Sequence, residues 1–202
     1  QQGGATSQPA VPSAAAPALV FDGVTVVDVK QGQLVPAQRV VIAGNRIQIV
    51  GSHDAVELPA EARVVDAHDK YLIPGLWDMH AHVLTPNWPG GYLPYAGYVL
   101  AGVTGIREMS TPGLDSVLRW RREFAQGTKL GPRVLTPGPA VPYQPPSDTF
   151  RAPNYLAYVH TPAEGRRVVD SLQHAGADFL KIYPTFNTMP REIYLAMLGE
   201  AR

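Results

Sequence analysis

Two histidines separated by a single residue are the first feature of this sequence that could do chemistry. In a β-strand, residues two apart point to the same face, so His80 and His82 would present both imidazoles on one side. Two neutral imidazoles at that separation can hold one divalent ion, and Zn²⁺ is the usual ion for a nitrogen-rich site. A His-x-His pair is also common in solvated loops, so the surrounding elements must decide between the two interpretations.

A lysine inside an apolar stretch is the second such feature. Lys181 lies between Leu180 and Ile182, and it shares a strand face with Phe179 and Tyr183. A buried ammonium group is costly unless it is paired or chemically altered. Two interpretations stay open. The amine can extend to the end of the strand, or the lysine can be converted to a carbamate, an anionic oxygen ligand able to bridge two metal ions.

The expected secondary structure around these residues changes near Lys70. Before it, residues 19–69 are expected to form short strands, with a tight hairpin turn at Gly44-Asn45. After it, apolar strands alternate with amphipathic helices. The expected strands lie near 71–80, 103–109, 132–137 and 179–183, and the expected helices near 92–101, 114–124, 161–176 and 190–200.

This order predicts an α/β fold in which helices cover a parallel sheet. Four strand–helix units make half of an eight-stranded (β/α)8 TIM barrel, which normally takes about 250 residues. We therefore expect residues 70–202 to form the first four βα units of an incomplete barrel, and residues 19–69 an incomplete β-sandwich module. Catalytic groups gather at the carboxyl ends of barrel strands, and this position favours a metal site at His80 and His82.

Composition excludes several classes of function. The 202 residues include 17 basic and 17 acidic side chains, a balance that gives no reason to expect nucleic acid or an anionic membrane as a partner. No apolar run approaches the ~20 residues that span a bilayer. The absence of cysteine excludes a thiolate metal site, a disulfide framework and a cysteine nucleophile.

The first 18 residues differ in composition from everything after them. Residues 1–18 carry no charge and no periodicity, and they are expected to be a disordered leader. One interpretation is a cloning remnant or a fragment boundary. The other, which we favour, is the stalk left after a signal peptide is removed, so an exported location is expected over a cytoplasmic one.

Four stretches, in order, resemble the barrel strands of the amidohydrolase superfamily. Tyr71–His82 is similar to that superfamily's first strand, Gly102–Met109 to its second, Gly131–Leu135 to its third and Gly176–Tyr183 to its fourth. The series points to the branch of imidazolonepropionase-like and prolidase-like enzymes, and it covers about residues 19–202. The leading module fits as well, because these enzymes carry a small β-sandwich built from both chain ends.

The resemblance implies a metal-dependent hydrolase of amide-type C–N bonds that uses a metal-activated water. His80 and His82 would bind the more buried of one or two divalent ions, most simply Zn²⁺, and Lys181 as its carbamate would bridge to a second. Asp78 would steady the strand end or a histidine. The family also uses a histidine after strand five, another after strand six and a general-base aspartate after strand eight, none of which lies in this sequence.

The resemblance also implies small amide substrates: dipeptides with C-terminal proline, acylated amino acids or cyclic amides. An insert at residues 138–159 leaves the third strand on the catalytic face, where loops set specificity. Arg151 within this insert, and His160 directly after the insert, could contact a substrate. Equally, the insert could serve as a rigid surface cover. Tyr183 is a further candidate because it shares a face with Lys181. The remaining histidines are expected to be exposed: His53, His68 and His174.

Three functions stay open for the chain. In the leading hypothesis it is the N-terminal part of a hydrolase, inactive alone and a homo-oligomer at full length. In the second it is a non-catalytic half-barrel that binds or assembles with a partner, since unpaired sheet edges promote association. In the third it is one half of a split enzyme.

Overall fold

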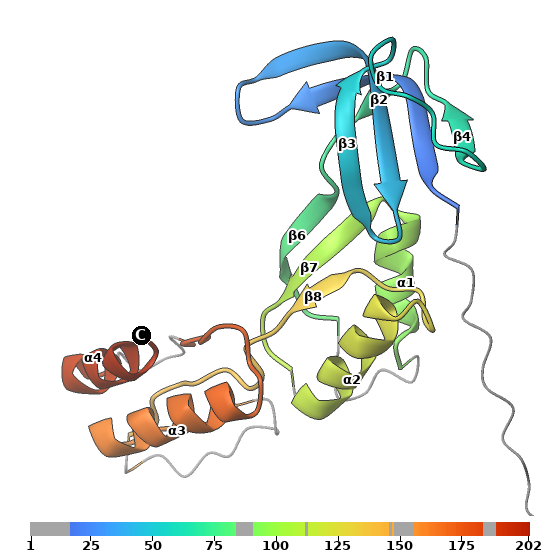
Figure 1. Ribbon diagram of the computed structural model, residues 1–202. Helices are drawn as coiled ribbons and strands as arrows, with labels where there is room; N and C mark the ends of the chain where they lie inside the picture. The colour runs from blue at the N-terminus through green and yellow to red at the C-terminus, as the bar shows by residue number, and fades with distance from the viewer. Residues whose placement is uncertain (1–16, 84–90, 112, 146, 148–155, 184–188) are drawn as a thin grey trace, which may run out of the picture. The chain divides into compact units, whose positions relative to one another are not determined.

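The computed structural model describes residues 17–83, 91–111, 113–145, 147, 156–183 and 189–202 (Figure 1). The chain divides into two compact units between Pro74 and Gly75, and each is described by itself. Within the described part, no helix is long and apolar enough to cross a membrane.

The first unit is a five-stranded sheet. Its strands are β1 (Leu19–Asp28), β2 (Gln33–Ala43), β3 (Arg46–Ser52), β4 (Arg63–Asp66) and β5 (Tyr71–Leu72). The order is β3-β2-β1-β4, with β5 also paired to β1. Neighbours β1, β2 and β3 are antiparallel, whereas β4 and β5 run parallel to β1. The predicted hairpin joins β2 to β3, and Gly44 has the positive φ of 59° that its turn needs.

A small apolar cluster holds this sheet together. Val24, Val40 and Ala67 are buried at its centre. The sheet also leaves large apolar side chains in contact with solvent, including Leu34, Ile47 and Ile49. In places, therefore, only one face of the described sheet is buried, as in an antiparallel sheet with one packed and one open face.

The second unit contains a parallel sheet and helices. Strands β6 (Leu76–Ala81), β7 (Val103–Glu108) and β8 (Arg133–Leu135) lie in the order β6-β7-β8, and both pairs are parallel. The helices are α1 (Leu93–Leu100), α2 (Leu114–Ala125), α3 (Pro162–His174) and α4 (Arg191–Glu200). Helices α1 and α2 follow β6 and β7 in turn, so the predicted alternation of strands and helices is confirmed, and with it the α/β class. A closed or half-closed barrel stays a prediction.

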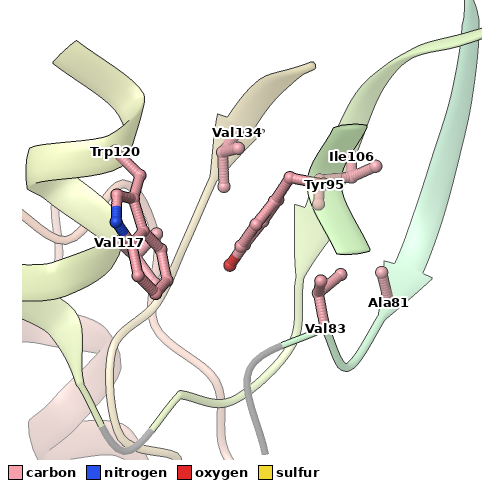
Figure 2. Packing of buried hydrophobic residues seen from close by; sticks show 7 residues of the cluster. All are labelled: Ala81, Val83, Tyr95, Ile106, Val117, Trp120 and Val134. Atoms are coloured by element: carbon pink, nitrogen blue, oxygen red, sulfur yellow. The ribbon is translucent and has the colours of Figure 1, made fainter. Parts of the chain in front are cut away.

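An apolar cluster joins the three strands to the first two helices. Its buried members come from β6 and the residues after it, β7, β8, α1 and α2: Ala81, Val83, Tyr95, Ile106, Val117, Trp120 and Val134 (Figure 2). The Tyr95 ring packs against Trp120 and Phe124 with centroids 5.8 and 5.6 Å away. Burial of these side chains supplies the main attraction between the sheet and its helices, at roughly 1.5–3 kcal/mol for each large residue.

Strand β6 contains a bulge at the residues that carry the predicted chemistry. Asp78 pairs with Ile106, but the next pair is Ala81 with Glu108, so three steps along β6 face two steps along β7. A bulge of this kind bends the strand and redirects a side chain relative to simple alternation. Strict alternation would place Asp78 on the same face as His80 and His82, and the bulge breaks that alternation between them.

The predicted fourth strand is wrong in its extent. Around Lys181 the structure has only an isolated bridge, in which Ile182 pairs in parallel with Val141 and not with β8. The reason lies in residues 136–139, where two prolines and Gly138, with a φ of 69°, interrupt the third strand. Beyond this interruption, Val141 pairs with Ile182, while at its start the Asp178 amide donates to the Thr136 carbonyl at 2.8 Å.

Helix α3 begins as the sequence predicts. The Thr161 hydroxyl accepts a hydrogen bond from the Glu164 amide at 3.2 Å, and Pro162 occupies the first turn. The Glu164 carboxylate accepts a hydrogen bond from the His160 amide at 2.8 Å, one residue earlier than in the usual capping box. After the helix, Gly176 adopts a φ of 91°, the conformation that ends many helices.

Close packing of β6 against β7 leads to a testable difference between two glycines. Gly105 pairs with Trp77, and a Cβ atom at position 105 would overlap the Trp77 indole. Gly105→Ala is expected to lower the free energy of unfolding by about 1–3 kcal/mol. Gly97→Ala is the matched control, because a Cβ there meets nothing within 4 Å and α1 gains helix propensity. Urea unfolding of both variants checks this; equal midpoints would contradict it.

Candidate metal centre

The structure places His80 and His82 side by side at the end of β6. Their ring centroids are 5.3 Å apart with an interplanar angle of 52°. Both side chains are exposed, whereas Ala81 and Val83 between and after them are buried in the apolar cluster. The two imidazoles therefore project from the face of the strand that is opposite the helices, as their spacing predicts.

This separation suits two ligands of one metal ion. Zn–N bonds of about 2 Å at a tetrahedral angle place the centroids of two ligating imidazoles about 5 Å apart. The observed 5.3 Å is close to that separation. Among the residues that the structure describes, no group of three or more histidine, cysteine, aspartate or glutamate side chains could hold a metal ion. The pair therefore fits a metal as a partial ligand set.

Local electrostatics favour the neutral, ligating form of His82. Although His82 is exposed, partial desolvation of its ring by the surrounding protein lowers the pKa of the imidazole, and the nearby charges of His80 and Lys181 lower it further. A metal ligand must be deprotonated, so a lowered pKa reduces the competition from protons. Lys181 contributes to this effect through its positive charge, although it lies 99 residues further along the chain.

The backbone of Lys181 is fixed by the segment that follows β8. The Lys181 carbonyl accepts a hydrogen bond from the Val141 amide at 2.8 Å, and the Tyr183 amide donates to the Val141 carbonyl at 3.2 Å. The lysine side chain is half-buried. Half-burial is compatible both with an amine that extends to the strand end and with a carbamate, so both interpretations stay open.

Asp78 contacts the backbone of the histidine strand and a tyrosine. Its Oδ1 accepts a hydrogen bond from the His80 amide at 3.0 Å, and its Oδ2 accepts one from the Tyr98 hydroxyl of α1 at 3.2 Å. Burial and then the Asp78 charge raise the pKa of Tyr98, so the hydroxyl stays protonated and remains a donor. Asp78 thus connects the bulge to α1 through the main chain of His80 and not through its ring.

The structure describes two of the three predicted substrate-contact residues, His160 and Tyr183. The His160 ring makes a 2.7 Å hydrogen bond between Nδ1 and the Gln144 carbonyl, which orients the imidazole within the insert. Tyr183 is exposed. Arg151 lies outside the described residues. The role of each as a substrate contact stays a prediction.

One of the three histidines expected to be exposed is not a free loop residue. His53 Nδ1 lies 2.9 Å from Asp22 Oδ1 and 3.1 Å from an Arg39 nitrogen, and its side chain is only one-third exposed. The expectation failed because both partners are distant in sequence. His68 and His174 are exposed, with Asp66 and Asp170 as their respective neighbours at 2.6 and 3.2 Å.

Two charged residues of β7 that sequence reasoning did not single out also hold the histidine strand. Arg107 donates from Nε to the Met79 carbonyl at 2.9 Å, and Glu108 is fully buried and accepts a hydrogen bond from the Val83 amide. A glutamate next to Met109 at the end of a strand was the available signal, since buried carboxylates are rare without a partner.

Comparison with known proteins finds relatives of similar sequence and structures of similar fold. No family model matches the chain. The chain is 37% identical over 94 residues to an allantoinase of Streptomyces avermitilis. This match covers 43% of this chain and 21% of the relative. A putative prolidase from Bifidobacterium longum superposes with a TM-score of 0.76 at 27% identity, over 93% of this chain and 47% of the other.

A second solved structure has the same fold. A prolidase complexed with N-methylphosphonate-L-proline superposes with a TM-score of 0.73 at 24% identity, over 91% of this chain and 53% of the other. This chain spans about half the length of these structures and about a fifth of the allantoinase. Together the comparisons confirm the resemblance predicted from the four strand motifs.

Proposed function

We propose that this chain, which resembles the amidohydrolase superfamily, is part of a metal-dependent hydrolase that cleaves amide-type C–N bonds. The observation that carries the proposal is the pair of imidazoles, 5.3 Å apart, at the end of the first strand of a parallel sheet. In α/β enzymes of this architecture, side chains at the carboxyl ends of strands perform the chemistry.

The residues of this chain would bind and orient the ion. His80 and His82 would be two of its ligands, and Lys181, as its carbamate, would supply an anionic oxygen. Asp78 would hold the His80 backbone through the 3.0 Å hydrogen bond already described. A divalent ion held there, most simply Zn²⁺, supplies Lewis acidity toward water and toward a substrate carbonyl.

The proposed substrates are small amides, first among them dipeptides with C-terminal proline. The likeness to two prolidase structures supports this class, and the likeness to an allantoinase keeps cyclic amides in the set. Acylated amino acids complete it. Tyr183, His160 and Arg151 are the side chains proposed to contact the substrate.

Removal and replacement of the metal test the proposal. The full-length protein is expected to hydrolyse at least one of these substrates, to lose that activity on dialysis against a chelator and to regain it when Zn²⁺ is added. Release of the amine product is measured with a fluorogenic reagent, and metal content by atomic emission. Zn²⁺ binding without hydrolysis of any substrate in the set would instead favour a non-catalytic binding protein.

A further inference from the structure

Side chains, as well as the sheet ladder, hold the backbone around the two histidines. Inside the bulge of β6, the Met79 carbonyl accepts a hydrogen bond from Arg107 and the His80 amide donates to Asp78. A bulge leaves main-chain groups without ladder partners, and unpaired groups allow a strand end to move. The direction of each histidine side chain therefore depends on the side-chain hydrogen bonds that replace those of the ladder.

The main chain on both sides of His82 is fixed by β7 and the residue after it. Before His82, the Ala81 carbonyl accepts a hydrogen bond from the Met109 amide at 2.8 Å. After it, the Val83 amide donates to both carboxylate oxygens of Glu108, at 3.0 and 3.1 Å. Glu108 therefore holds the peptide group that follows His82.

The Glu108 carboxylate is itself held in place. It is 0% exposed, and its Oε2 also accepts a hydrogen bond at 3.4 Å from the hydroxyl of Tyr95, which is likewise 0% exposed. Burial, followed by the Glu108 charge, raises the pKa of Tyr95, so the phenol remains a donor. A carboxylate at this depth costs free energy that an apolar residue would not, and its bonds to Val83 and Tyr95 offset that cost.

We propose that Glu108 is a positioning residue that fixes the main chain after His82 and thereby the direction in which His82 presents its imidazole to a metal ion. The inference rests on the proposed function for the identity of the ion, but not for the geometry. Glu108 acts through Val83 and does not touch the metal. Partners that orient a ligand in this way are typically worth 10–100-fold in metal affinity.

Variants of Glu108 in the full-length protein test this role. Glu108→Ala is expected to lower the affinity for Zn²⁺ about 10–100-fold, measured by competition with a chromophoric chelator. Glu108→Gln keeps an oxygen for the Val83 amide and is expected to recover most of that loss. Glu108→Asp keeps the charge but withdraws the carboxylate by one methylene, so it is expected to lose affinity. Glu123→Ala, which removes an α2 carboxylate paired with Lys129, is the matched control and should bind Zn²⁺ normally.

A metal-free measurement separates this inference from the proposed function. The ¹³C relaxation of the His82 ring is expected to show greater mobility in Glu108→Ala than in the unsubstituted protein and in Glu108→Gln, while the His174 ring is unchanged. If the unsubstituted protein does not bind Zn²⁺, the proposed function fails and the ring mobility alone decides the positioning role. Equal Zn²⁺ affinity and equal ring mobility in the unsubstituted protein and the Ala variant would overturn it. If the Ala variant does not fold, the Asp and Gln variants give the same comparison.

Discussion

Full-length protein carrying His82→Ala is expected to bind Zn²⁺ more than about 100-fold more weakly than the unsubstituted protein and to lose hydrolysis with it. Partners that only orient a ligand are worth 10–100-fold, so removal of a ligand should exceed that range. The 5.3 Å separation of the His80 and His82 rings predicts the same for His80→Ala, since neither imidazole alone forms a chelating pair.

The measurement is chelator competition for affinity together with the initial rate of substrate hydrolysis. His174→Ala is the control, because this histidine is exposed on α3 and pairs with Asp170 on the same helix. The control is expected to retain both affinity and rate. Unchanged Zn²⁺ affinity in His82→Ala, with the fold intact by circular dichroism, would remove this pair from the metal site and with it the main support for the proposed function.

Local signals predicted most of the elements because the physics of those elements is local. The Thr161 cap and the proline after it define the start of α3 within four residues of chain. The Gly44-Asn45 turn joins β2 to β3 by a conformation that glycine adopts without strain. In both cases the information lies in adjacent residues, and no contact from elsewhere is needed to interpret it.

Features that depend on distant residues could not be predicted in this way. The bulge in β6 is a change in its register against β7 between Asp78 and Ala81, and nothing within 71–82 encodes that register. The pairing of Ile182 with Val141 depends likewise on where the third strand resumes after residue 139. At the site, the spacing of His80 and His82 predicted two rings on one face, but the partner of Glu108, the Val83 amide 25 residues away, could not be read from the sequence.

The first unit contains a charge cluster that leads to the second large prediction. Arg39 is 8% exposed, and its Nε donates to Asp22 Oδ1 at 2.6 Å. Its other nitrogens contact the Val56 carbonyl and His53. The cluster thus joins β1 and β2 to the segment after β3. Breaking a buried ion pair by removal of one partner typically costs 3–5 kcal/mol, because the remaining charge is left without compensation.

Arg39→Met is therefore expected to lower the free energy of local unfolding in β1 and β2 by about 3 kcal/mol. Amide hydrogen exchange followed by mass spectrometry measures this in the full-length protein, because exchange reports opening strand by strand. Arg46→Met, at the exposed start of β3, is the matched control and should change protection by less than about 0.5 kcal/mol. The double variant Arg39→Met with Asp22→Asn is expected to recover part of the loss, since no unpaired charge then remains.

The pH dependence of that loss identifies its electrostatic part. Arg39, chiefly through its hydrogen bond, and His53 to a smaller extent lower the pKa of Asp22 from 3.8 to about 2, against the opposing effect of burial. A carboxyl group whose pKa is lower in the folded state contributes stability that is fully present above its unfolded pKa and is lost as pH falls toward its folded pKa. The difference in protection between the unsubstituted protein and Arg39→Met is therefore expected to be constant above about pH 5 and to narrow from about pH 4 toward pH 2. A difference that stays constant across this range would mean that Arg39 stabilises the sheet through packing of its side chain and not through the charge of Asp22.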